Sequence, residues 1–177
     1  RATEFLLDLG HERIALINGL EFMDFAYRRR IGYEAALAGR GMTPDPALMR
    51  AEEMTEVYGF RTAAEMLAAD RPPTAFLVSS MITAIGVRRA IHDAGLQMGR
   101  DISVITHDDD LGYLKNGHSV PIFTATRSSV REAGERAAEM LLDHIRNPGG
   151  KPLTHLMEAE LIIGTSTGPA RKVPQPT

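Results

Sequence analysis

"TAFLVSSMITAIGVRRAIHDAGLQMGRDISVITHD" (residues 74–108) decides the fold. Residues 74–80 carry four apolar side chains in a row and predict a buried strand. Residues 82–95 repeat apolar side chains at helical spacing and end in glycine, and 101–108 is again rich in β-branched residues. A strand, a helix and a second strand in this order are typical of parallel strands joined by a crossover helix.

The same alternation extends toward the N-terminus. Residues 13–19 and 47–54 read as strands, and 27–41 and 56–70 read as helices. The sequence therefore predicts an α/β fold, with a parallel sheet and helices on both of its faces. The strands are expected to begin near residues 13, 48, 74 and 101.

After residue 108 the rhythm changes. Residues 109–121 predict a loop, 122–127 an extended segment, and 153–167 extended chain that ends as a hairpin or an edge strand. The best helix of the chain lies between them, at 129–146, where Ser129 and Glu132 have the spacing of a capping box. Its apolar stripe consists of Val130, Ala133, Gly134, Ala137, Leu141 and Ile145.

Composition narrows the function classes. The 177 residues suffice for a domain with its own core, and a net charge of −3 gives no general attraction to DNA or to anionic membranes. The absence of cysteine excludes disulfides, thiolate metal sites and cysteine nucleophiles, and it fits a reducing compartment. We find no apolar run of membrane-spanning length and no signal peptide, so the expected location is the cytoplasm, without a membrane partner.

The first ten residues already read as a helix, with Ala2, Phe5, Leu6 and Leu9 on one face and Gly10 as its stop. Because a protein seldom starts within a helix, we expect the chain to be a piece of a longer protein.

A ligand site is expected at the carboxyl ends of the strands, where open parallel sheets bind their ligands. Asp108 lies at this edge, after the strand at 101–108. Two interpretations stay open: Asp108 faces a ligand, or the three consecutive aspartates form a solvated turn that satisfies backbone donors.

Three arginines at 28–30 lie near the expected start of a helix, where cations oppose the helix dipole, so at least one should have a partner. A guanidinium binds carboxylates or paired hydroxyls, although surface arginines are also common. The familiar hydrolase, zincin, phosphate-loop and dinucleotide motifs are absent. His107 beside Asp108 has no second histidine at ligand spacing, so we expect neither a metal nor a cofactor.

Seven ordered segments, which together run from about residue 2 to about residue 168, resemble the LacI-type (lactose/galactose repressor) family of bacterial transcription regulators. They are "LGHERIALI" (9–17), "RRRIGYEAAL" (28–37), "YGFRTAAEML" (58–67), "RPPTAFLVSS" (71–80), "GLQMGRDISVITHDD" (95–109), "FTATRSSVREAGERAAEMLL" (123–142) and "ELIIGTSTGPA" (160–170).

The resemblance implies a type 1 periplasmic-binding-protein-like fold with two subdomains around an effector cleft. Residues 1–121 would form the core of the C-terminal subdomain, and 122–150 would be a crossover strand and helix belonging to the N-terminal subdomain. Residues 151–168 would return to complete the first subdomain, and 169–177 would be a flexible tail. The apolar stripe of the helix at 129–146 would then lack part of its packing in this chain.

The resemblance also implies ligand-binding residues. Arg29 matches the family's effector-binding arginine and Asp108 the aspartate that usually follows Gly-Tyr, which is Thr106-His107 here. The two would offer a donor and an acceptor to a hydroxyl-rich ligand. Other matching positions carry residue types unusual for the family, which implies a less polar pocket: Phe25, Met54, Ser80 and Ser128.

By resemblance, Ile85, Arg89 and Tyr113 are candidate contacts of a homodimer, although Ile85 could equally be ordinary core. The expected function is that of the effector-binding portion of a regulator, which senses a sugar-like or nucleoside-like molecule. A helix-turn-helix outside this segment would bind operator DNA. The alternatives are a periplasmic sugar-binding protein of an uptake system, which the "ELIIGTST" ending disfavours, and an α/β enzyme.

Overall fold

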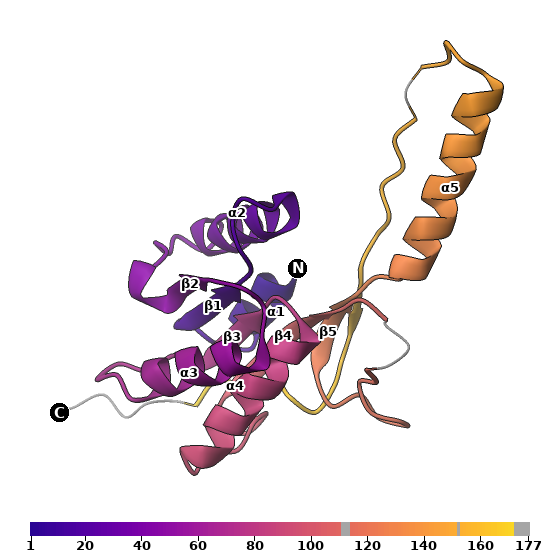
Figure 1. The fold of residues 1–177 in the computed structure, drawn as a ribbon. Helices are drawn as coiled ribbons and strands as arrows, with labels where there is room; N and C mark the ends of the chain where they lie inside the picture. The colour runs from indigo at the N-terminus through magenta and orange to yellow at the C-terminus, as the bar shows by residue number, and fades with distance from the viewer. Residues whose placement is uncertain (111–113, 152, 172–177) are drawn as a thin grey trace.

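The computed structural model describes residues 1–110, 114–151 and 153–171. Its centre is a six-stranded sheet in the order β2-β1-β3-β4-β5-β6 (Figure 1). Neighbours from β2 to β5 pair in parallel, and β6 pairs antiparallel with β5. The strands are β1 (Ile14–Asn18), β2 (Met49–Ala51), β3 (Ala75–Val78), β4 (Ser103–Asp108), β5 (Thr124–Arg127) and β6 (Glu160–Ile162).

Helices cover both faces of the sheet, which confirms the predicted fold class. Leu6, Tyr33 and Leu37 pack with Ile14 and neighbouring strand residues on one face. The other face carries a separate core that joins two further helices to the strands. The first face is covered by α1 (Ala2–Asp8) and α2 (Asp24–Ala38), and the second by α3 (Glu56–Leu67) and α4 (Met81–Asp93).

Two glycines let α3 and α4 approach closely. A Cβ on Gly59 would lie 2.1 Å from the carbonyl oxygen of Thr83, and one on Gly86 would lie 2.0 Å from that of Glu56. Any side chain at either position would therefore force the helices apart. Thr55 caps α3, because its hydroxyl accepts a hydrogen bond from the Tyr58 amide at 3.1 Å.

The apolar spacing in residues 82–95 predicts that Ile82, Ile85, Ala90, Ile91 and Ala94 face inward, and this is partly wrong for α4. Ala90 and Ile91 are buried, but Ile82 and Ile85 are each 39% exposed and Ala94 is exposed. The contact of α4 with α3 centres on Gly86. The buried stripe of α4 is therefore offset by one residue from Ile82 and Ile85. It consists of Met81, Thr83, Ala84, Gly86, Val87, Ala90 and Ile91.

The expected start of α2 is also wrong, because the helix begins at Asp24 rather than near Tyr27. The arginines at 28–30 therefore lie in its second turn. Asp24 occupies the first turn, where an acidic residue favours the helix dipole, and it pairs with Arg28 at 2.7 Å.

The segment after β4 divides between the sheet and a projecting helix. The strand β5 belongs to the main sheet, whereas the sequence had assigned residues 122–150 together to another subdomain. The helix α5 (Val130–Arg146) stands away from the sheet (Figure 1), and none of its residues is buried. Its predicted cap is present, because the Ser129 hydroxyl accepts from the Glu132 amide at 3.2 Å.

The returning chain closes the far side of the sheet through β6, as an edge strand. Contacts continue past it: the Ala170 amide donates to the Leu9 carbonyl at 2.9 Å, and Arg171 pairs with Asp101. Two residues near the start of the expected flexible tail are thus attached to the body of the molecule. Residues 172–177 lie outside the described residues.

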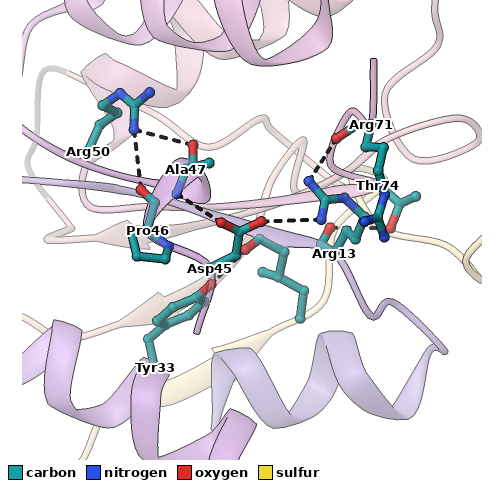
Figure 2. A network of polar contacts seen from close by, with 9 residues as sticks. Arg13, Tyr33, Asp45, Pro46, Ala47, Arg50, Arg71 and Thr74 are labelled. Atoms are coloured by element: carbon teal, nitrogen blue, oxygen red, sulfur yellow. Dashed lines mark hydrogen bonds and ion pairs between the residues drawn. The ribbon is translucent and has the colours of Figure 1, made fainter. Parts of the chain in front are cut away.

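The amino end of the sheet is held by a polar network that ties three loops together (Figure 2). Arg13 donates to the Asp45 carboxylate at 3.3 Å and to the Arg71 carbonyl at 2.7 Å. Asp45 also accepts from the Ala47 amide at 3.0 Å. Below the network, the Tyr33 hydroxyl donates to the Ile14 carbonyl at 2.8 Å. This end of the sheet is thereby fixed, opposite the end where ligands are expected.

Buried His11 makes a second connection at the same end. Its Nδ1 contacts the Thr74 hydroxyl at 2.9 Å, and its Nε2 lies 2.9 Å from the Ser103 hydroxyl and 3.0 Å from the Gly168 carbonyl. Burial lowers the pKa of His11, and the hydrogen bond to Gly168 opposes this effect. One imidazole thus joins two strand starts to the C-terminal segment.

Candidate functional site

Arg29 is the central cation at the carboxyl end of the sheet. It extends from α2 and donates a hydrogen bond from Nη1 to the Ser79 carbonyl at 2.9 Å, just beyond β3. Its guanidinium carbon lies 5.1 Å from the centre of the Phe25 ring. Burial lowers the pKa of Arg29, while the charge of Asp109 acts in the opposite direction. The guanidinium is thus partly withdrawn from water at the edge where ligands bind.

Phe25 and Met54 both approach Gly19, at the carboxyl end of β1. A Cβ on Gly19 would lie 3.2 Å from the Met54 sulfur and 3.4 Å from Phe25 Cε2, so both side chains converge on the glycine that follows β1. Phe25 remains 37% exposed. Two positions that the sequence singled out separately therefore lie close to the same glycine at the carboxyl end of β1.

A pocket of about 360 Å³ opens on the α1/α2 face of the sheet. Arg29 and Ser79 line one side, His107 and Thr126 line another, and Leu77 belongs to its apolar floor. The returning segment 156–159 and the start of α1 complete the wall. This pocket combines an apolar floor with a few convergent polar groups, as small-molecule sites do.

Arg29 is the one predicted ligand-binding residue among those that line this pocket, and His107 is a polar lining residue that was not among the candidates. Its Nε2 lies 2.9 Å from an Asp109 carboxylate oxygen and 3.3 Å from the Ser128 hydroxyl, and its Nδ1 lies 3.1 Å from the Thr126 hydroxyl. Burial lowers the pKa of His107, as does the charge of Arg29, and Asp109 opposes both. The sequence signal that could have identified His107 is its position in the strand. It lies two residues after Ile105, which is buried, so both side chains take the same face of β4.

Asp108 is buried, and its carboxylate accepts a hydrogen bond from the Asp110 amide at 2.9 Å. Alternation along β4 directs Asp108 to the face opposite His107, and the carboxylate whose charge acts on Arg29 is that of Asp109. Asp108 therefore has the turn-stabilising contact that one of the two interpretations expected. Joint binding of a ligand by Arg29 and Asp108 stays a prediction.

Two predicted polar positions have structural partners. The Ser80 hydroxyl accepts from the Thr83 amide at 3.3 Å and caps α4. The structure brings Ser128 into contact with His107. Ser80 and Ser128 thus lie at the expected edge, and their part in ligand binding stays a prediction.

The candidate dimer contacts lie on and after α4. Ile85 is partly exposed, and Arg89 lies 4.0 Å from the centre of the Phe60 ring and pairs with Glu56 at 2.9 Å. Tyr113 lies outside the described residues. The exposure of Ile85 removes the alternative that it is ordinary core, while dimer formation itself stays a prediction.

The serine, histidine and aspartate of this site do not have the arrangement of a hydrolase triad. In a triad the serine and the aspartate contact opposite imidazole nitrogens, whereas Ser128 and Asp109 both contact Nε2 of His107. Among the residues that the structure describes, no group of three histidine or acidic side chains could hold a metal ion. None of the described helices has the length and apolarity to cross a membrane.

The fold and this site define a ligand-binding domain of the periplasmic-binding-protein type. A family model described as "Periplasmic binding protein-like domain" matches residues 3–167. The chain belongs to this family, in the branch formed by the LacI-type transcriptional regulators.

Two similar regulators support the same family assignment. The chain is 49% identical over 170 residues to the HTH-type transcriptional regulator AglR of Rhizobium meliloti, covering 96% of this chain and 48% of AglR. It is 31% identical over 167 residues to the repressor CytR of Escherichia coli K12, covering 94% of this chain and 48% of CytR. The chain thus spans about half the length of these relatives.

Solved structures give the same assignment. The lactose repressor bound to the anti-inducer ONPF superposes with a TM-score of 0.82 at 29% identity, over 94% of this chain and 60% of the repressor chain. The CelR–cellobiose complex also gives 0.82, at 26% identity, over 93% of this chain and 49% of CelR. The fold expected from the ordered sequence motifs is confirmed.

Proposed function

We propose that this chain is the effector-binding portion of a cytoplasmic regulator that senses a small polar molecule, sugar-like or nucleoside-like. The observation that carries the proposal is the partly buried Arg29 guanidinium at the carboxyl end of the sheet, anchored to Ser79 and beside Phe25. A guanidinium donates several hydrogen bonds in one plane, and Ser79 accepts only one of them. The other donors suit a ligand with adjacent hydroxyl or carboxylate oxygens.

The relatives support the choice of ligand class without fixing the ligand. One solved relative is a complex with cellobiose. The pocket of this chain has an apolar floor, and the Phe25 ring lies against the Arg29 guanidinium that lines the pocket. A ring with an apolar face and polar edge groups fits that combination. We do not propose that this chain is an enzyme. An enzymatic activity of the protein that the Asp108→Ala variant abolished would contradict the proposal.

We further propose that the six-stranded sheet, with β5 included, belongs to one subdomain together with α1 to α4, and that α5 packs in a second one that completes the cleft. The exposed apolar side chains of α5, among them Leu141 and Ile145, support this division. Regulation would follow from linkage: a ligand that favours one closure state would shift a homodimer between forms with different affinities for operator DNA. Ile85 and Arg89 would lie in the dimer contact.

A thermal-shift screen of the full-length protein with sugars and nucleosides, followed by operator mobility-shift assays, tests this function. We expect at least one compound to raise the melting temperature and to change the affinity for operator DNA. The upstream gene sequence distinguishes the alternative, because a helix-turn-helix supports the regulator and a signal peptide supports a periplasmic binding protein. A stabilising sugar without any effect on DNA binding would contradict the regulatory part.

A further inference from the structure

His107 and Thr126 face one another across neighbouring strands of the candidate site. They are register partners of β4 and β5, and both line the 360 Å³ pocket that also contains Arg29. Each imidazole nitrogen of His107 has its own partner: Nδ1 lies 3.1 Å from the Thr126 hydroxyl, and Nε2 lies 2.9 Å from the Asp109 carboxylate. The ring is therefore held in a definite orientation.

These two contacts decide which nitrogen carries the proton. A carboxylate oxygen can only accept a hydrogen bond, so Nε2 must donate to Asp109. In the neutral ring Nδ1 then has a lone pair, and the Thr126 hydroxyl must donate to it. The hydrogen of that hydroxyl is committed to His107, and only its oxygen lone pairs remain for a ligand.

We propose that His107 is a positioning residue that holds the Thr126 hydroxyl as a hydrogen-bond acceptor in the pocket that the donor Arg29 also lines. This inference rests on the proposed function and makes its ligand class more specific. The ligand must present a donor, such as a hydroxyl group, to Thr126 and an acceptor oxygen to Arg29. A neutral polyol ring meets both requirements, because each hydroxyl donates and accepts.

Protonation of His107 would reverse this polarity. A second ring proton makes Nδ1 a donor, so the Thr126 oxygen must accept and its own hydrogen turns toward the pocket. The charged groups around the ring are Arg29 from α2, Asp108 at the end of β4 and Asp109 after it, while Arg1 and Glu158 line the same pocket. Burial and Arg29 favour the neutral ring, so ligand affinity should fall only as the pH drops below the ordinary histidine range.

Long-range ¹H–¹⁵N spectra of histidine-labelled full-length protein test the arrangement without a ligand. We expect the His107 ring, assigned with His107→Gln, to be the Nε2–H tautomer at pH 7.5. Asp109→Asn should reduce the share of that tautomer. Thr126→Val should shift the Nδ1 resonance toward that of an unbonded nitrogen, and Thr126→Ser should restore it. An Nδ1–H tautomer in the wild type, or a Thr126→Val spectrum equal to the wild-type one, would overturn the proposal.

Calorimetry with D-glucose, D-ribose and uridine as probes tests the ligand role. For a probe that binds the wild type, Thr126→Val should weaken binding by about tenfold and Thr126→Ser much less, because only valine lacks the acceptor. Equal affinities of the two variants would overturn the role of Thr126. Failure of the wild type to bind any sugar or nucleoside would instead contradict the proposed function, since the tautomer is read without ligand.

Discussion

At the scale of single residues, buried His11 predicts a pH-dependent stability. Its pKa is lowered in the folded protein, so the unfolded chain binds more protons as the pH falls below about 6.5. Its contribution to stability is therefore fully present above that pH and is lost as the pH falls toward the folded-state pKa. Urea unfolding at pH 7.5 and 5.5 should show lower stability at pH 5.5.

The control for this prediction is His11→Gln, which keeps hydrogen-bonding capacity without a titrating group. The pH dependence should become smaller in this variant, although not zero, because His107 also has a lowered pKa. An unchanged difference between the two pH values would show that the burial of His11 is not the source of the effect.

At the residue scale, Arg29 was selected by its match to the effector-binding arginine of the family, and the structure has it at the carboxyl end of the sheet, beside Ser79. The roles of Asp108 and His107 could not be separated in this way, because they depend on which sheet face each side chain takes and on the turn through Asp110. That turn is a tertiary feature with weak local signals.

At the scale of elements, the contact between α3 and α4 predicts a large penalty for added side-chain atoms. Gly59→Ala and Gly86→Ala would each place a Cβ within about 2 Å of a carbonyl oxygen, and such overpacking should cost roughly 1–3 kcal/mol. Gly32→Ala is the matched control, because its Cβ would meet no atom within 4 Å in a helix. Urea unfolding should show that Gly59→Ala and Gly86→Ala are clearly less stable than Gly32→Ala. Equal free energies of unfolding for the three variants would contradict the close approach of α3 and α4.

The order of elements was predictable, because apolar periodicity and glycine stops are local properties of the chain. The inward face of α4 was not, since Ile82 and Ile85 are as apolar as the residues that pack beneath α3. The small residues Gly59 and Gly86 decide that face, and their importance appears only once two helices are placed against each other. Similarly, the resemblance placed residues 122–150 together in another subdomain, and the pairing of β5 with β4 is not encoded locally.

At the scale of the whole molecule, α5 predicts a partner inside the same protein. Its apolar stripe has no buried residue in this chain, so its amides should exchange quickly with deuterium here. In the full-length protein, peptides from residues 130–146 should become much slower, while peptides from β1 and β3 should exchange as before. Equal exchange of α5 in both forms would contradict the proposed second subdomain.

The central claim is that the Arg29 guanidinium binds the effector, and calorimetric titration of the full-length protein with the ligand found by screening tests it most directly. Arg28→Ala is the matched control, because Arg28 is an exposed neighbour that pairs only with Asp24 among the described residues. We predict that Arg29→Ala weakens ligand binding by about tenfold or more, while Arg28→Ala leaves the affinity unchanged. Equal affinities of the Arg29→Ala variant and the wild type would contradict the claim.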